Sequence, residues 1–414
     1  MKLNLDNFKA PDLTEWRSKI MTETGSNEKH IYHNKVEGIQ IDTTDKTNSL
    51  NFESDFKNIP NDWNIGAFHN LTDAIETNHF LLKCLSHGAN ELNLNIQIAD
   101  PNWETVFNEI HLDIIHIVIA FRNEDQINSF FKFLPKKYEK NFSVSIDPLN
   151  PIGLNKVLDS NLTIAINGFN IEQIGAKASD QLSLLLYFGE TLLQSVQDES
   201  RIRFEVGIGS DFFLETAKIR ALKWLWLHLL SKNKRSNSTC NISAKIGWSN
   251  KSLRDPDINI LRQTTETISA ISGGVNSVLI HSSHTLSNDQ NNWLYQRMAL
   301  NISHILKEES YLSKVNDPLK GSFIIENLTE KIISNSWNQF LQWMDCEHLE
   351  IIKANLKSNI SEARKLKTLS FDAGEKQLLG INLYPATIDK KISWVSIPDY
   401  LGFDYLIFEN RQHA

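Results

Sequence analysis

The hydrophobic pattern of the chain repeats in short segments from about residue 70 onward. Hydrophobic and polar residues alternate strictly in several of them, which predicts β-strands, and the nearly continuous apolar run from Ile114 to Phe121 is typical of a buried parallel strand. The segments predicted as strands are residues 92–98, 114–121, 142–146, 162–166, 202–206, 242–246, 277–280 and 323–325.

Most of these segments are separated by stretches with the spacing of helices. The predicted helices cover residues 71–85, 179–194, 211–232, 256–272 and 291–312. Strands that alternate with helices predict a parallel sheet. About eight such units in 414 residues favour an α/β fold with a closed (β/α)8 barrel of the TIM type. Periodicity alone does not separate this fold from an open doubly wound sheet.

The same pattern suggests a division of the chain into three parts. Residues 1–70 carry few periodic signals and are expected to form an extended arm with a short helix over residues 12–21. Residues 71–385 are expected to form the barrel domain, and residues 386–414 a C-terminal tail.

The second face of the predicted strands is unusually polar for a barrel, whose interior is normally branched and apolar. The polar candidates for the barrel axis are Asn93, Asn95, Gln97, Ser143, Ser145, Arg203, Glu205 and Lys245. Buried polar groups are costly unless they form hydrogen bonds. Either a polar ligand lies along the axis, or these side chains bond to one another. Alternatively, some of these strands face water at an edge, and a one-residue register error would invert the assignment.

Composition and motifs exclude several classes of protein. A net charge of −8 argues against a nucleic-acid binder, and the three cysteines form no C-x-x-C pair for zinc. The apolar runs are too short for a membrane span, and the N-terminus lacks a secretory pattern, so we expect a cytoplasmic protein. His281 and His284 follow a predicted strand, but without clustered carboxylates we interpret them as surface or loop residues and expect no metal site.

Three ordered blocks between residues 213 and 322 resemble the barrel domain of the methylmalonyl-CoA mutase family. They are residues 213–222, residues 255–277 and residues 297–322, and their order and spacing are highly specific together. The matching positions are Arg220, Asp255, Arg262, Glu266, Gly273, Gly274, Arg297, Asn301, Asp317 and Gly321. The resemblance implies that the three arginines anchor one element to another. For any single arginine, a solvent-facing helix position is the alternative.

The chain departs from the catalytic members of that family. Those members carry a flavodoxin-like cobalamin domain with an Asp-x-His-x-x-Gly motif, which these 414 residues lack; residues 386–414 resemble the start of the linker to it. They also carry a substrate tyrosine where Phe68 stands here. A histidine expected shortly before Gly247-Trp248 is missing, because no histidine lies between Cys240 and Gly247.

The resemblance therefore implies a small, non-catalytic subunit with no catalytic residues of its own. A homologous larger chain would bind adenosylcobalamin and the acyl-CoA substrate in a heterodimer, while this chain binds no cofactor, nucleic acid or membrane. One alternative is a barrel chain completed by a separate small cobalamin-binding protein. Another is an accessory protein that kept the barrel and lost the complex.

Overall fold

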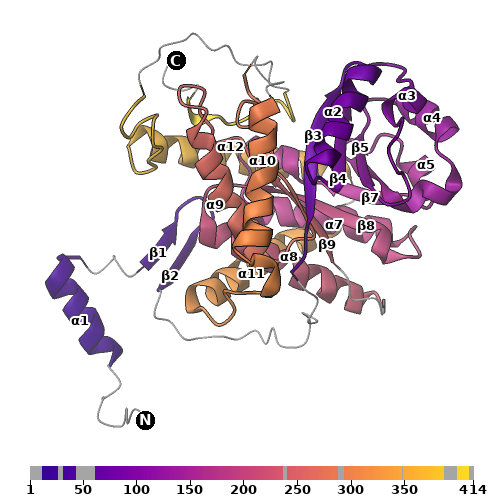
Figure 1. Ribbon diagram of the computed structural model, residues 1–414. Helices are drawn as coiled ribbons and strands as arrows, with labels where there is room; N and C mark the ends of the chain where they lie inside the picture. Colours follow the sequence, from indigo (N-terminus) through magenta and orange to yellow (C-terminus); the bar gives the residue numbers. More distant parts are fainter. Residues whose placement is uncertain are drawn as a thin grey trace, which may run out of the picture.

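Eight parallel strands close into a barrel in the order β10-β3-β4-β5-β6-β7-β8-β9 (Figure 1). The computed structural model describes residues 12–26, 31–42, 61–235, 240–287, 293–346, 348–386 and 399–409. The barrel strands are β3 (Asn64–Leu71), β4 (Glu91–Ile96), β5 (His116–Ala120), β6 (Phe142–Ile146), β7 (Thr163–Asn167), β8 (Ile202–Ile208), β9 (Asn241–Ile246) and β10 (Ser277–Leu279). The predicted (β/α)8 barrel is thus confirmed.

One predicted strand is wrong and one real strand was missed. Residues 323–325 begin a helix, because the apolar pattern continues at helical spacing through Leu328 and Ile332, and a three-residue run cannot reveal its period. The strand that closes the barrel is β3, which pairs with β4 and β10. The barrel accordingly begins at Asn64 and not at residue 71. The rest of the predicted division into domains stays a prediction.

Helices surround the barrel, and most of them cover the outer face of its strands (Figure 1). They are α2 (Ala74–Ser86), α3 (Trp103–Val106), α4 (Glu124–Phe133), α5 (Leu154–Leu158), α6 (Phe169–Gln173), α7 (Ala178–Leu193), α8 (Phe212–Lys232), α9 (Ile258–Gly273), α10 (Trp293–His304), α11 (Phe323–Met344) and α12 (Leu349–Asp372). By contrast, α11 packs on α7 and α8, and α12 packs against α6 and α7. Helix α8 is capped by Asp211, whose side chain accepts from the backbone N–H of Leu214.

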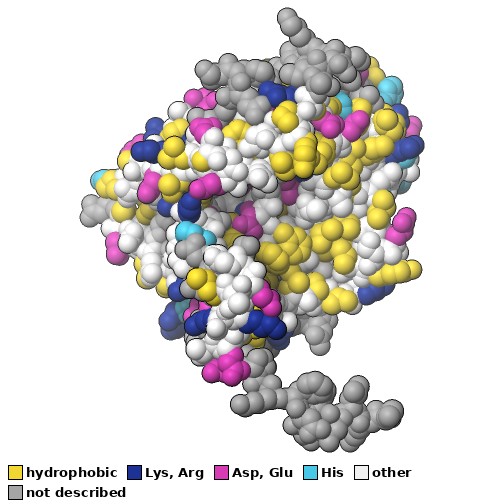
Figure 2. All heavy atoms as spheres, turned by 90° about the vertical axis from the view of Figure 1, so that its left-hand side faces the viewer, with side chains coloured by type: hydrophobic (Ala, Val, Ile, Leu, Met, Phe, Trp, Pro, Cys, Tyr) yellow, Lys and Arg dark blue, Asp and Glu magenta, His cyan; other side chains and the backbone are white. Residues whose placement is uncertain are grey.

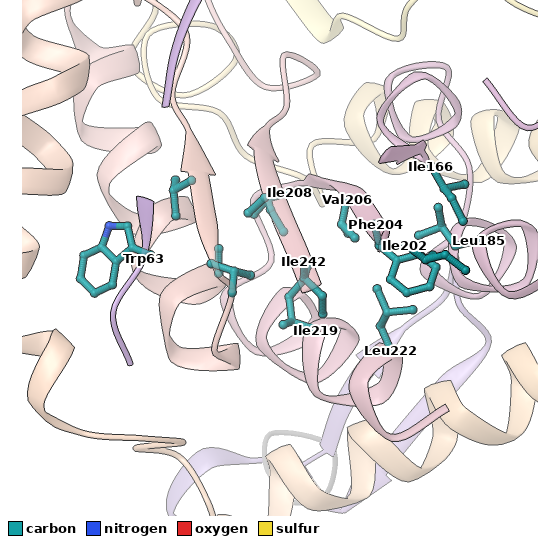
Figure 3. Packing of buried hydrophobic residues seen from close by; sticks show 14 of the residues in the cluster. Trp63, Ile166, Leu185, Ile202, Phe204, Val206, Ile208, Ile219, Leu222 and Ile242 are labelled. Atoms are coloured by element: carbon teal, nitrogen blue, oxygen red, sulfur yellow. The ribbon is translucent and has the colours of Figure 1, made fainter. Parts of the chain in front are cut away.

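The hydrophobic core lies between the outward strand face and these helices. Phe204 and Val206 of β8 lie near Ile219 and Leu222 of α8, and all four are buried (Figure 3). Because side chains alternate across a strand, the residues between them point to the barrel axis. This alternation is why β8 can be apolar outside and charged inside.

The N-terminal region holds more structure than an extended arm. Helix α1 (Leu13–Thr24) contains the predicted short helix and buries no residue, and it stands away from the barrel (Figure 1). Strands β1 (Ile31–Asn34) and β2 (Ile39–Asp42) form an antiparallel hairpin. The hairpin is attached to the barrel by Glu37, whose carboxylate accepts from the backbone N–H of Ala178 at 2.6 Å. Within the described residues, no helix has both the length and the apolarity needed to cross a membrane.

Candidate functional site

The barrel axis near the start of the strands is closed by a buried ion pair. Glu91 of β4 and Arg203 of β8 lie 2.8 Å apart, and their side chains are 0% and 3% exposed. Ser277 of β10 and Asn93 of β4 donate to the same Glu91 oxygen at 2.8 and 3.2 Å. Burial disfavours the charged carboxylate, but Arg203 and the other partners outweigh it and hold the pKa of Glu91 below its usual value.

A neutral histidine lies beside this pair. His116 of β5 contacts the hydroxyl of Ser143 of β6 at 2.8 Å. Burial lowers the pKa of His116 to about 4, with Arg203 acting in the same direction and Glu91 opposing both. The ring is therefore uncharged near pH 7, and it adds bulk and a hydrogen bond to the axis without adding charge.

A second ion pair lies further along the axis. Lys245 of β9 and Glu205 of β8 lie 2.7 Å apart, with Glu205 fully buried. Ser145 of β6 donates its hydroxyl to Glu205 at 2.5 Å, and Asn167 of β7 donates to Ser145 at 3.3 Å. Six strands thus contribute polar side chains to the two pairs and their partners: β4, β6, β7, β8, β9 and β10.

The two remaining axis candidates, Asn95 and Gln97, lie at the C-terminal end of β4. Both donate to the side-chain oxygen of Asn70, at 3.2 and 3.3 Å. The structure therefore brings the eight polar candidates together into short networks on the inner face or rim of the barrel. Sequence reasoning missed Glu91 because the predicted strand began one residue too late. The same alternation, extended by one residue, would have found it.

The C-terminal mouth of the barrel holds a cavity of about 330 Å³ with an aromatic wall. Phe68 from β3 meets the ring of His281 edge-on at a centroid distance of 4.8 Å. Trp248 and Phe169 lie 5.1 and 5.9 Å from the same ring. Residues 399–409 border this mouth, because Tyr400 donates to Asp147 at 2.7 Å and the backbone N–H of Leu406 donates to the Gln173 carbonyl at 2.8 Å.

His281 and His284 were expected to be surface or loop residues, and both lie in the loop after β10. They are not at the surface, because their exposed fractions are only 3% and 7%. His281 packs into the aromatic wall of the mouth, and His284 stacks on Tyr295 of α10 at 3.5 Å. The loop folds inward because these flat rings bury apolar surface. Among the described residues there is no group of three or more His, Cys, Asp or Glu side chains placed to hold a metal ion.

Three of the family-like positions converge on one buried charge cluster outside the barrel. Arg220 of α8 donates to Glu326 of α11 at 2.9 Å and is paired with Asp317 at 3.0 Å. The backbone N–H of Gly321 donates to the same Glu326 at 2.8 Å, and Gly321 has a φ of +84° that favours glycine. The Arg220 side chain is 1% exposed, so it joins two helices and does not face solvent.

Residues of the second family-like block, 255–277, also form buried polar contacts with neighbouring segments. Glu266 of α9 accepts from Lys251 at 2.6 Å and from Asn250 at 2.7 Å, and all three residues are buried. Arg262 donates to the carbonyl of Leu379 and to Asn259. Asp255 lies near this contact, with its Cβ next to Gly380.

The remaining family-like positions differ in their surroundings. Gly273 allows α9 to approach α8 closely, since a Cβ there would lie 2.6 Å from that of Ile219. Gly274 ends α9 with a φ of +85°. Arg297 and Asn301 of α10 are both exposed. The exposure of Arg297 gives no support to the anchoring role that the resemblance implies for it. The functional roles of all these positions stay predictions.

Comparison with known families gives a clear result for this barrel. Residues 155–401 match the family model described as methylmalonyl-CoA mutase, which is more than half of the chain. The chain belongs to the methylmalonyl-CoA mutase family. Among its relatives is a protein of Porphyromonas gingivalis named methylmalonyl-CoA mutase small subunit, which is 34% identical over 239 residues, covering 53% of this chain and 38% of that protein.

Other relatives of the methylmalonyl-CoA mutase family are similarly distant. The Escherichia coli methylmalonyl-CoA mutase is 30% identical over 274 residues, covering 61% of this chain and 36% of that protein. The chain therefore matches little more than a third of the length of these relatives. Among solved structures, a dihydropteroate synthase from Xanthomonas albilineans aligns with 11% identity and a TM-score of 0.37, covering 60% of this chain and 94% of that one. That likeness is too distant to bear on function.

Proposed function

We propose that this chain is the small subunit of a heterodimeric methylmalonyl-CoA mutase, an isomerase that interconverts methylmalonyl-CoA and succinyl-CoA. In this proposal the chain is structural. A homologous larger subunit binds adenosylcobalamin and the acyl-CoA and performs catalysis, and the complex works in the cytoplasm. The likeness to a relative named as a small subunit supports this assignment.

The filled barrel axis is the observation on which the proposal rests. A CoA tail threaded along the axis would have to displace the Glu91–Arg203 and Glu205–Lys245 pairs, whose carboxylates are fully buried. Separating a buried charge from its partner costs roughly 3–5 kcal/mol. Two such separations are a large fraction of the stability of an ordinary domain. The side chains that close the axis therefore argue against a catalytic barrel.

The barrel mouth is equally unsuited to the cofactor of the family. Adenosylcobalamin supplies the radical chemistry when it is bound, but a corrin ring is far larger than the cavity of about 330 Å³ at this mouth. Tyr400 and Tyr405 line that cavity from the C-terminal segment, and Phe68 offers no hydroxyl to a substrate. The residues at the mouth thus do not fit the group, and no step through it is assigned to this chain.

The outer surface carries exposed hydrophobic side chains that a protein partner could cover. Figure 2 shows hydrophobic side chains gathered on one face of the molecule. Exposed large apolar side chains also occur on three separate helices: Leu261 on α9, Leu294 on α10 and Leu341 on α11 are 66%, 43% and 45% exposed. Large exposed apolar patches commonly mark protein interfaces. We therefore expect the partner to cover part of the helical layer.

Co-expression tests the proposal. The full chain would be produced with a full-length homologous mutase chain from the same organism, and the mass and activity of the purified complex would be measured with added adenosylcobalamin. We expect a one-to-one complex that converts methylmalonyl-CoA, while this chain alone is inactive.

Two controls separate the alternatives. Activity of this chain with only a small cobalamin-binding protein would contradict the proposal and favour the split enzyme. Failure to associate with the larger chain would instead favour an accessory protein outside the complex.

A further inference from the structure

A further cavity lies outside the barrel, between the N-terminal hairpin and the ends of three helices. Its volume is about 450 Å³, which is within the range of small-molecule sites. Its lining comes from the β1–β2 hairpin, from the starts of α7 and α8, and from the end of α12 with the loop that follows it. Among the described residues, this cavity shares no lining side chain with the cavity at the barrel mouth. A ligand held here would therefore be separate from the axis and from the mouth.

Two buried acceptors on the wall of this cavity have no partner among the described residues. One oxygen of Glu37 accepts from the backbone N–H of Ala178 at 2.6 Å, but Oε2 accepts no hydrogen bond. The amide nitrogen of Gln181 donates to the carbonyl of Gly168 at 2.7 Å, which leaves Oε1 as its unpaired atom. Glu37 and Gln181 are only 8% and 1% exposed. Because buried acceptors rarely stay without donors, the start of α7 suits a ligand group that carries several N–H donors.

Two lysines on the same wall have no carboxylate at ion-pair distance among the described residues. The ammonium of Lys367 donates one of its three hydrogens to the carbonyl of Ala176 at 3.0 Å. The ammonium of Lys376 lies 4.3 Å from the centroid of the Phe408 ring. Burial lowers the pKa of Lys376 to about 8, and Lys367 acts in the same direction, so Lys376 is mainly protonated near pH 7. The two ammonium groups repel each other, and an anion beside them would offset that repulsion.

Most of the other charged groups on this wall already have partners. Lys218 pairs with Glu215 at 2.5 Å, and Asp211 and Glu172 each accept a hydrogen bond from a neighbouring side chain. Five lysines and five acidic residues line the cavity as a whole. A ligand with a single charge would upset this balance, whereas a zwitterion preserves it.

We propose that this cavity binds a free α-amino acid. The ammonium group of the ligand donates to Glu37 and Gln181, and its carboxylate accepts from Lys367 and Lys376. These acceptors and cations can serve one small ligand, because Glu37 and Lys367 are both bound to backbone groups within residues 176–178. The inference is independent of the proposed subunit role, since neither a partner chain nor the barrel mouth takes part.

Calorimetric titration of the full chain with the protein L-amino acids tests this site. We expect saturable one-to-one binding of at least one of them. Its amide lacks the carboxylate and its α-hydroxy acid lacks the ammonium group, so both are matched controls. Each control should bind at least about tenfold more weakly than the amino acid.

Substitutions at the two ends of the site should act separately. Glu37→Gln removes the charge that faces the ligand ammonium, and Lys376→Met removes a cation that faces its carboxylate. Each should weaken binding of the amino acid at least about tenfold. Glu350→Gln and Lys353→Met alter an ion pair on α12 that does not line the cavity, and they should leave the binding unchanged.

A second measurement does not depend on the variants folding. In the wild-type chain, saturation with the amino acid should slow hydrogen exchange in residues 31–42 and 367–376, while exchange in β5 stays unchanged. Absence of saturable binding, equal binding of either control compound, or binding that leaves exchange in these two segments unchanged would each overturn the proposal.

Discussion

The lower axis and the mouth of the barrel differ in how completely side chains fill them. In the lower axis, Glu91, Arg203, Asn93 and Ser277 each make at least one polar contact with another side chain of the same group. At the mouth, His281 makes none, and its neighbours are aromatic rings and an open volume. The same eight strands thus close the axis at one level and leave a cavity at the other.

This difference distinguishes a closed level of the barrel from an open one. A filled axis needs charges that neutralise one another, because buried charges are tolerated only in pairs. The mouth holds aromatic rings around an open volume, so fewer charges have to be neutralised there. The predictions below probe the two levels separately, beginning with the largest expected effect.

Removing the cation of the lower axis should be the most damaging change. Arg203→Met leaves the Glu91 carboxylate buried without its partner, which should lower the free energy of unfolding by about 3–5 kcal/mol. Urea denaturation measures this loss. Arg17→Met is the matched control, because the Arg17–Asp42 pair is largely exposed and should change stability by less than about 1 kcal/mol. If the two substitutions lowered the free energy of unfolding equally, the claim that a buried ion pair closes the axis would be contradicted.

The ion pair nearer the mouth should tolerate substitution better. Lys245→Met deprives Glu205 of its cation, but Ser145 still donates to that carboxylate and the lysine side chain is 12% exposed beside the cavity. We expect a loss of about 1.5–3 kcal/mol. The same denaturation series measures both variants. If Lys245→Met lowered the free energy of unfolding more than Arg203→Met, the expected order of the two ion pairs would be wrong.

The buried histidine of the mouth should make stability fall in acid. Because burial holds the pKa of His281 at about 3 in the folded chain, below its usual value of 6.5, the unfolded chain takes up a proton first as the pH drops. The stabilisation is complete above pH 6.5 and is lost progressively toward pH 3, by about 2 kcal/mol at pH 5.

His281→Phe should therefore flatten the stability curve between pH 6.5 and pH 5. His69 and His116, whose pKa values burial lowers to about 4, keep part of the slope in the variant. Identical slopes for wild type and variant would mean that His281 is solvated in the folded chain.

The smallest effect is expected at the segment that borders the mouth. Tyr400→Phe removes one hydrogen bond to Asp147 and should cost about 1 kcal/mol. Hydrogen exchange of residues 399–409 should increase, while exchange in β4 and β8 stays unchanged. Faster exchange throughout the barrel would show that the segment supports the whole fold and not only its mouth.

The sequence was most informative where strands follow their own alternation. Residues 142–146 form β6 with the predicted bounds, and the polar face of β8 lies inside the barrel as its pattern suggested. Strand β3 was missed because Gly66, Ala67 and His69 give a weak strand signal, and its role depends on pairing with β4 and β10. Pairing between strands distant in the chain is not encoded in local periodicity.

The mouth was harder to predict for the same reason. His281 follows β10, and its environment consists of Phe68, Phe169 and Trp248 from three other parts of the chain. Nothing in the residues next to His281 distinguishes a buried ring from an exposed one. By contrast, the Arg220 cluster joins two of the blocks that resemble the family, and the resemblance had implied that Arg220 anchors one element to another.

Binding of CoA esters to this chain alone tests the central claim most directly. Equilibrium dialysis of the purified full chain against methylmalonyl-CoA and free CoA measures whether the barrel axis accepts a tail. With the Glu91–Arg203 and Glu205–Lys245 pairs in place, we predict no saturable binding up to millimolar ligand. Saturable micromolar binding of both compounds would contradict the account, because it would show that a CoA tail enters this chain.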